Sequence, residues 1–437
     1  MNPKHITYPM RFDSDGKYLK PFFGMGEIPM FQSVTHVECS PYWYRFFVKN
    51  LPPRPWPLTI NGRPFTIASQ TAEDLLLTPS KGSYRERTSL FQHIEPQASN
   101  TDIFVGNPNL RICENIDARQ DRFPETSLRA IARDVTETFS SHPDYPKVIE
   151  VMLTMDQKIV ISVGGETNLK SKANQLPGYI ACCEVIYTGV DDTSLERWSH
   201  WRSRQLTDRW WPDGVSKLPL FPGTRLRGSK GTGNPEGRRD AQHFSVNVSS
   251  GVLIKNQEGQ HMMTTAARIV RPGEVVGMRE FFLQNRIGLA ADVVPGTDVA
   301  LVRLDEAINY KNQDGTLTFT RLLGESPDDA LPWNSIVSLA THWPPFTKGI
   351  IVAKSVKVVR HPATTHYRVY HWAWTGQPGD EKGPNPGPRD TMIGAAAISE
   401  TGVVTGLLHS NERALWAGYS VMLSATELVG AGYSLVR

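Results

Sequence analysis

The sequence predicts an α+β amino-terminal region followed by an all-β region made of two antiparallel β-barrels. Three observations lead to this prediction. An amphipathic helix and several strand-like runs share the first half of the chain. From residue 241 onward, about nine short strand-like segments follow one another with turn residues between them. The 35 Gly and 32 Pro residues also interrupt the chain as often as in loop-rich β proteins.

The composition excludes several classes of protein. The 47 Lys and Arg residues nearly balance the 44 Asp and Glu residues, so a net charge of +3 does not predict a nucleic-acid partner. Four cysteines without a Cys-X-X-Cys pair exclude a disulfide-rich scaffold and argue against a zinc finger. Because neither an apolar signal segment nor a run of 18 apolar residues is present, we expect an intracellular, cytoplasmic protein with free thiols and no membrane association.

Residues 1–20 are polar and predict a flexible tail, and residues 21–190 predict an α+β domain. Within that domain, proline-broken apolar runs indicate strands and turns, and residues 123–139 predict a helix with Pro124 in its first turn. Four apolar residues recur there at helical spacing and form one stripe: Leu128, Ile131, Val135 and Phe139.

Three strands are expected after this helix. The segments KVIEVMLTM and KIVISVGG predict the first two, and YIACCEVIY predicts the third. Cys182 and Cys183 would alternate across the third strand, and we interpret them as buried, inert thiols.

Residues 191–240 predict a helix followed by a linker rich in Gly, Pro and basic residues. The helix begins at Thr193, where Glu196 completes a capping-box pattern. Tryptophans and arginines alternate along it and just beyond it, which favours a docking helix; stacking on nucleic-acid bases is the alternative. These residues are Trp198, Trp201, Trp210, Trp211, Arg197, Arg202, Arg204 and Arg209.

Two weaker patterns occur in the same region. Asp192, Glu196 and His200 stand at four-residue spacing and would suit a metal, but surface charges of a helix are the commoner explanation. The piece GSKGTGN lacks the Gly-Lys-Ser/Thr ending of a phosphate-binding loop. We therefore predict neither a metal nor a cofactor.

The second half of the chain carries three segments in an informative order. They are SSGVLIKNQEGQHMMTTAARIV (249–270), GTDVALVRLD (296–305) and DTMIGAAAISETGVVTGLLH (390–409). In this order they resemble the trypsin/chymotrypsin-like serine proteases, where Thr-Ala-Ala-His carries the general base, Asp-X-Ala-Leu the orienting carboxylate and Gly-X-Ser-Gly the nucleophile and oxyanion hole. The resemblance covers residues 241–437 and implies a trypsin-like double antiparallel β-barrel. The whole chain also resembles fungal proteins with a divergent amino-terminal half and a trypsin-like carboxy-terminal half.

The same resemblance indicates a degenerate catalytic triad. The base position holds Arg268, whose guanidinium stays protonated and cannot accept a proton. The nucleophile position holds Ile393, which has neither a hydroxyl nor a thiol. Thr391 and Gly394 occupy the oxyanion-loop positions, so only Asp298 of the triad survives.

Two consequences follow for the site. We predict an Arg268–Asp298 ion pair in place of the catalytic dyad; the alternative is that Asp298 caps backbone N–H groups while Arg268 faces solvent. Other histidines do not match the family's base position. His261 stands seven residues before Arg268 on the same predicted strand, which would put the two residues about 23 Å apart. The remaining histidines of this half are His342, His361, His366, His371 and His409.

Two functions from different classes fit these observations. The first is a catalytically inactive, pseudoprotease-like module that binds a protein or peptide. The alternative is a hydrolase of the trypsin-like superfamily with a non-standard active site.

Overall fold

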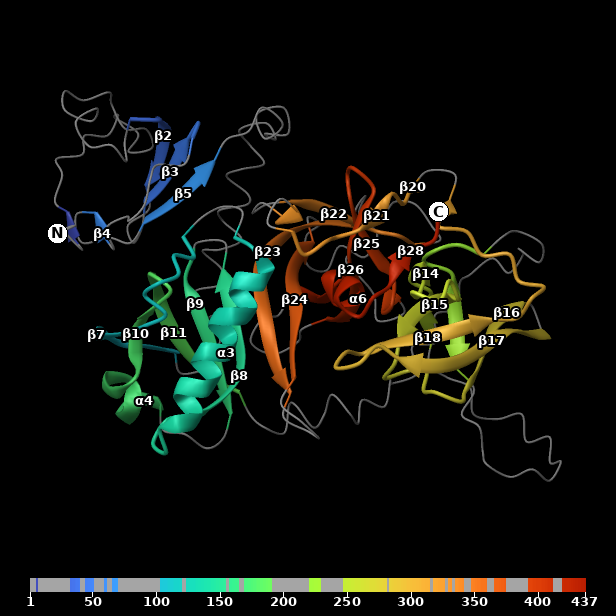
Figure 1. Cartoon of the computed structure of the whole chain (residues 1–437), viewed down its shortest axis with the longest axis horizontal. Coiled ribbons are helices and arrows are strands. Elements are labelled where there is room, and N and C mark those ends of the chain that lie inside the picture. The colour runs from blue at the N-terminus through green and yellow to red at the C-terminus, as the bar shows by residue number, and fades with distance from the viewer. Residues whose placement is uncertain are drawn as a thin grey trace. The chain divides into compact units, whose positions relative to one another are not determined.

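The structure is a computed structural model of the whole chain. It describes residues 5–6, 32–39, 44–50, 59–60, 65–69, 103–119, 123–154, 157–164, 169–190, 220–228, 247–280, 283–314, 317–326, 329–331, 335–341, 347–359, 365–374, 392–411 and 419–437. The chain divides into two compact units (Figure 1). They are Met1–Val190 with Ala330–Trp333, and Asp191–Asp329 with Asn334–Arg437.

The first unit combines one long helix with short sheets. Helix α3 spans Glu125–Ser141, and all four residues of the predicted apolar stripe are buried. It packs against strand β8 (Figure 1), which is why the stripe is apolar. The main strands of this unit are β6 (Ile103–Val105), β7 (Asn107–Ile112), β8 (Lys147–Thr154), β9 (Ile159–Gly164), β10 (Pro177–Ile180) and β11 (Cys183–Val190).

Strand β11 organises this sheet. It pairs in parallel with β9 and antiparallel with both β6 and β10, while β8 and β7 pair with β9 and β10. Smaller elements complete the unit: β1 (His5–Ile6), β2 (Val34–Cys39), β3 (Tyr44–Val48), β4 (Thr59–Ile60), β5 (Phe65–Ser69), α4 (Leu169–Lys172) and the 3-10 helix η3 (Ala173–Gln175). The mixture of helix and sheet agrees with the α+β prediction.

One prediction for this unit was wrong. The segment around Cys182 is not one strand, because Ala181 and Cys182 have positive φ angles of 48° and 65°. They form a tight turn between β10 and β11, which pair antiparallel. Two consecutive left-handed residues are what a two-residue hairpin turn requires, and neither residue is glycine. Cys183 is buried, Cys182 is half-buried, and neither forms a disulfide.

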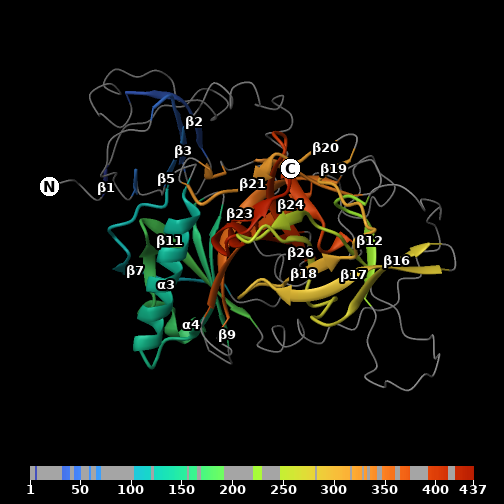
Figure 2. The same ribbon diagram turned by 45° about the vertical axis from the view of Figure 1, so that its right-hand side comes forward.

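The first β-barrel lies in the second unit. Its strands are β12 (Arg225–Gly228), β13 (Asn247–Ser249), β14 (Leu253–Lys255), β15 (His261–Ala266), β16 (Val275–Glu280), β17 (Leu283–Val293) and β18 (Val299–Leu304). Each neighbouring pair in the order β13–β12–β16–β17–β18–β15–β14 is antiparallel, and the two end strands, β13 and β14, follow each other closely in the sequence. Figure 2 shows β16, β17 and β18 of this barrel from another side.

The second barrel is a ring of six antiparallel strands. Its strands are β22 (Ile336–Leu339), β23 (Lys348–Val359), β24 (Thr365–Trp374), β25 (Ala396–Ser399), β26 (Val403–Asn411) and β27 (Tyr419–Ser424). The order is β22–β25–β26–β27–β24–β23, and β23 pairs with β22 again. The two sets of strands confirm the predicted trypsin-like double antiparallel β-barrel.

The second unit also contains several short elements. They are β19 (Gln313–Asp314), β20 (Leu317–Thr318), β21 (Arg321–Leu322), α6 (Thr426–Gly430) and β28 (Ser434–Leu435). Helix α6 directly follows β27 of the second barrel. Strand β28 pairs with β14, so the carboxy-terminal end is part of the first barrel's sheet.

The linker predicted in the second part of residues 191–240 was wrong for residues 225–228. Arg225–Gly228 forms β12, which pairs with both β13 and β16. Leu226 is fully buried in the barrel core. The basic and Gly-rich composition hid this strand, because only one apolar residue in RLRG faces the core. The predicted helix from Thr193 and the piece GSKGTGN lie outside the described residues.

Within the described ranges, no helix has both the length and the apolar composition needed to cross a bilayer.

Candidate functional site

Strand pairing brings two of the three triad-like segments together in the first barrel. Strand β15 ends at Ala266, which pairs with Val299 at the start of β18. The amide of Ala267 donates a 3.0 Å hydrogen bond to the carbonyl oxygen of Asp298. Arg268 and Asp298 are therefore neighbours because their strands are neighbours, as the sequence resemblance implied.

The third segment comes from the second barrel, just before β25. The carbonyl oxygen of Ile393 accepts a 2.8 Å hydrogen bond from the amide of Ser249. A side chain at Gly394 would place its Cβ 2.5 Å from the Ser249 carbonyl oxygen and 3.2 Å from the Ala266 nitrogen. Gly394 also has φ +92°, so glycine is required there both for space and for conformation.

The base position holds an ion pair, as predicted. The backbone amide of Arg268 donates a 2.6 Å hydrogen bond to Oδ1 of Asp298. The guanidinium Nε lies 3.6 Å from Oδ2, and the two side chains are 21% and 20% exposed. The alternative prediction was also partly right, because Asp298 caps a backbone N–H in addition to the pair.

The nucleophile position is apolar and buried. Ile393 is 6% exposed and belongs to the hydrophobic core cluster of the first barrel, with Val248, Met263 and Ala266 among its members. Its side chain thus contributes to packing at the position where the resembling proteases carry a hydroxyl. Thr391 lies outside the described residues, so the structure places only Gly394 of the predicted oxyanion loop.

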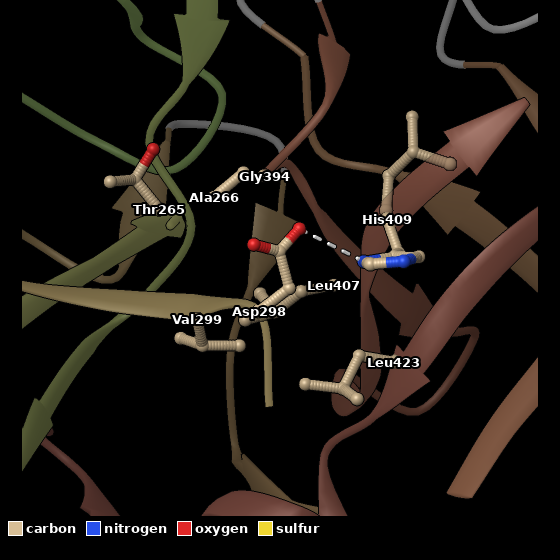
Figure 3. Close-up of a pocket in the computed structure, with 9 residues that line it drawn as sticks. Thr265, Ala266, Asp298, Val299, Gly394, Leu407, His409 and Leu423 are labelled. Atoms are coloured by element: carbon tan, nitrogen blue, oxygen red, sulfur yellow. Dashed lines mark ion pairs between the residues drawn. The ribbon is translucent and has the colours of Figure 1, made fainter. Parts of the chain in front are cut away.

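His409 is the residue that the sequence analysis missed. It lies on β26, and its Nδ1 is 3.2 Å from Oδ2 of Asp298 (Figure 3). The sequence indicated only that His409 does not match the family's base position, and it did not predict this contact. Leu407, Leu408 and His409 are all buried, so the apolar run before His409 indicated burial but not the partner.

The electrostatics of His409 favour the neutral imidazole. Burial lowers its pKa, and the positive charges of Arg268 and Lys357 lower it further, while Asp298 acts in the opposite direction. Neither contact to Oδ2 of Asp298 has full hydrogen-bond geometry, so the Arg268 contact acts mainly through charge, whereas the neutral His409 ring contributes only its dipole. At neutral pH, Asp298 therefore faces one guanidinium and one neutral imidazole.

A small pocket lies beside these groups (Figure 3). Its room suffices for about one water molecule. Aliphatic side chains and Gly394 form most of its wall, with Thr265, Asp298 and His409 as the polar members. The Thr265 hydroxyl donates a 3.0 Å hydrogen bond to the Ser249 carbonyl oxygen.

The other candidate residues lie elsewhere or are not described. His261 is exposed at the start of β15, while His366 and His371 lie on β24. Cys113, Cys182 and Cys183 belong to the first unit. Among the described residues, no group of three or more His, Cys, Asp or Glu side chains is arranged to hold a metal. Residues outside the described ranges are His342, His361, Asp192, Glu196 and His200.

Comparisons with known proteins give structural matches only. No protein-family model matches the sequence, and no curated protein matches it. Solved structures that match include Nocardiopsis protease (NAPase), with 18% identity and a TM-score of 0.33, covering 50% of this chain and 100% of that chain. Thermobifida fusca protease A matches with 15% identity and a TM-score of 0.32, covering 50% and 100%. Cellulomonas bogoriensis chymotrypsin matches with 16% identity and a TM-score of 0.29, covering 50% and 99%.

These scores are too low to carry the assignment by themselves. The assignment depends instead on the two antiparallel sheets of the second unit and on the meeting of the three segments at Asp298. On that basis, the carboxy-terminal half of the chain has the trypsin-like double-barrel fold.

Proposed function

We propose that this protein is a catalytically inactive, trypsin-like binding or scaffold module. The observation that carries the proposal is the buried, apolar Ile393 at the nucleophile position. Covalent catalysis by a trypsin-like site needs a hydroxyl at that place. Arg268 at the base position supports the same conclusion, since a guanidinium cannot take up a proton.

The space at the site also supports the proposal. Pockets that bind small molecules usually measure about 300–1,000 Å³. The pocket beside Asp298 has room for about one water molecule, far less than a substrate group requires. We therefore propose that the partner is a protein or peptide that binds to the surface of the barrels, with neither a metal nor a cofactor.

The proposal includes an intracellular location. Glutathione keeps thiols reduced inside cells, and structural disulfides are rare there. Cys113, Cys182 and Cys183 are free thiols, which supports this location. Fluorescence microscopy of the tagged full-length protein would test it.

Inactivity is tested most directly with the purified full-length protein. We expect no labelling by a fluorophosphonate probe and no hydrolysis of chromogenic peptide esters, with trypsin as the positive control. Stoichiometric labelling of one residue, mapped by mass spectrometry, would overturn the proposal. Affinity purification with the full chain as bait is then the route to the partner.

A hydrolase with a non-standard site is the second candidate, and the Asp298–His409 contact is the observation that favours it. A neutral imidazole held by a carboxylate is the arrangement that a general base needs. Burial of His409 and the small pocket oppose this candidate. If esterase activity is found, its loss in His409→Asn with retained folding would support the hydrolase and exclude the inactive module.

A further inference from the structure

We propose that the contact between Asp298 and His409 is a pH-sensitive latch between the two barrels. The junction is most stable while the imidazole is neutral and loosens when the imidazole takes up a proton, because the cost of burying that charge beside Arg268 exceeds the gain in attraction to Asp298. The inference does not depend on the proposed binding function, because it concerns only how the two barrels are joined.

The latch joins residues of different barrels. Asp298 directly precedes β18 of the first barrel, and His409 lies on β26 of the second, with 3.2 Å between Oδ2 and Nδ1 (Figure 3). A second link between the barrels lies close by, where the Ser249 amide donates to the Ile393 carbonyl oxygen at 2.8 Å. Gly394 adjoins this link and lines the pocket beside His409. Loss of the contact between Asp298 and His409 would therefore weaken the support of the hydrogen bond between Ser249 and Ile393.

The charges around the imidazole explain why a proton would loosen it. The charged groups that act on His409 within the described residues are Asp298, Arg268 and Lys357. Asp298 is the only anion among them, and its carboxylate already faces the Arg268 guanidinium. A protonated His409 would be a third cation next to a single carboxylate. Its side chain is only 7% exposed, so water would compensate little of that charge.

The direction of the pH effect follows from proton binding. Burial and the two cations lower the pKa of His409 in the folded protein. An unfolded or opened chain has an ordinary histidine pKa of about 6.5 and so binds more protons than the folded chain at mildly acid pH. The stability from this site is therefore present above about pH 6.5 and is lost as the pH falls below it.

Amide hydrogen exchange of the full-length protein, read by NMR, tests the latch. The reporter is the Ser249 amide, whose acceptor lies on the other barrel. Two reference amides bond within one barrel each: Thr264 to the Val252 carbonyl oxygen at 2.9 Å, and Leu408 to the Ala395 carbonyl oxygen at 2.8 Å. Between about pH 7.5 and about pH 5, we expect protection of the Ser249 amide to fall at least about tenfold more than that of the references. Equal changes at all three amides would overturn the latch.

Two variants assign the effect to His409. His409→Asn keeps a nitrogen donor near the position of Nδ1 but cannot be protonated, so its Ser249 amide should show no extra pH response. His261→Asn is the matched control, because His261 is exposed on β15, and it should respond like the parent protein. An unchanged pH response in His409→Asn would refute the latch.

A further variant decides the question if His409→Asn does not fold. Lys357→Met removes one of the two cations, which brings the pKa of His409 closer to its unfolded value. The acid loss of protection at the Ser249 amide should then be smaller than in the parent protein. A loss as large as in the parent would count against the latch.

Discussion

The backbone amide of Arg268 donates a 2.6 Å hydrogen bond to Oδ1 of Asp298, whereas the side chain of the same residue approaches Oδ2 only to 3.6 Å. The position of a catalytic base is thus held to Asp298 mainly by its main chain. The side-chain contact is longer and partly exposed, so water competes for it. Asp298 should consequently matter to the fold far more than the charge of Arg268 does.

A double-mutant cycle measures this difference. Arg268→Ala should lower the free energy of unfolding by about 0–1 kcal/mol, as expected for an exposed pair. Asp298→Ala should cost about 1–3 kcal/mol, because the Arg268 amide and the His409 ring both lose their partner. Urea melts of both single variants and the double variant should give a coupling of about 0–1 kcal/mol. A coupling of several kcal/mol would mean that the pair acts as a buried salt bridge.

Gly394 offers a prediction with an internal control. Gly394→Ala puts a Cβ 2.5 Å from a carbonyl oxygen at a position with φ +92°, so we expect a loss of more than about 3 kcal/mol or failure to fold. Gly259→Ala has a similar φ of +81° but no atom within 4 Å of the new Cβ. Its cost should be about 1–2 kcal/mol, from backbone conformation alone. Equal melting temperatures of the two variants would contradict the close approach at Gly394.

Tyr310 links separate segments of the first barrel. Its hydroxyl donates to the Gly251 carbonyl oxygen at 2.9 Å and lies 3.1 Å from Oγ of Ser250. Burial raises the pKa of this phenol, so it stays a donor at physiological pH. Tyr310→Phe should cost about 1–3 kcal/mol, because the buried carbonyl oxygen loses its donor. Thermal melts should show no comparable loss for Tyr433→Phe, a half-buried tyrosine near the carboxyl terminus.

Sequence patterns predicted those elements whose hydrophobic period is clear. The apolar stripe of α3 predicted that helix within two residues of its observed bounds, and the apolar run in VALVRL coincides with strand β18. Strand β12 was missed because RLRG presents a single apolar residue, and β17 because polar residues interrupt its apolar ones. These segments are strands because they pair with neighbouring strands, and a local sequence pattern does not reveal such pairing.

The candidate site, too, could be predicted from the sequence only in part. Arg268, Asp298 and Gly394 could be placed from one chain because each belongs to a short motif with a fixed relation to a strand. His409 ends the third segment but stands at none of its triad positions, and its contact with Asp298 arises from how one barrel packs on the other. The positive φ angles of Ala181 and Cys182 were equally hidden, since neither residue type favours that conformation. Contacts made across the fold were therefore the ones that sequence reasoning missed.

Cys113 gives a pH-dependent prediction for the first unit. Burial raises the pKa of its thiol to about 11, with a smaller contribution from the negative charge of Asp134. Because only the thiolate reacts, iodoacetamide should label Cys113 about a hundredfold more slowly near pH 8 than it labels an ordinary cysteine. The rate should rise about tenfold per pH unit toward pH 11. Peptide mapping of the native and the urea-unfolded protein provides the comparison, and equal rates would contradict the raised pKa.

Introducing a histidine at position 268 and a serine at position 393 should not produce a working protease. In the double variant Arg268→His with Ile393→Ser, the new imidazole would compete with His409 for the single carboxylate of Asp298. The new hydroxyl would replace a side chain of the first barrel's core, which should cost about 2–4 kcal/mol. Ile393→Val, a smaller change at the same place, should cost only about 0.5–1.5 kcal/mol and calibrates that loss.

We expect no turnover of chromogenic peptide esters and no fluorophosphonate labelling at position 393, because the groups around the site are not positioned for catalysis. Stoichiometric labelling at that position would show that the site retains the geometry of a working protease.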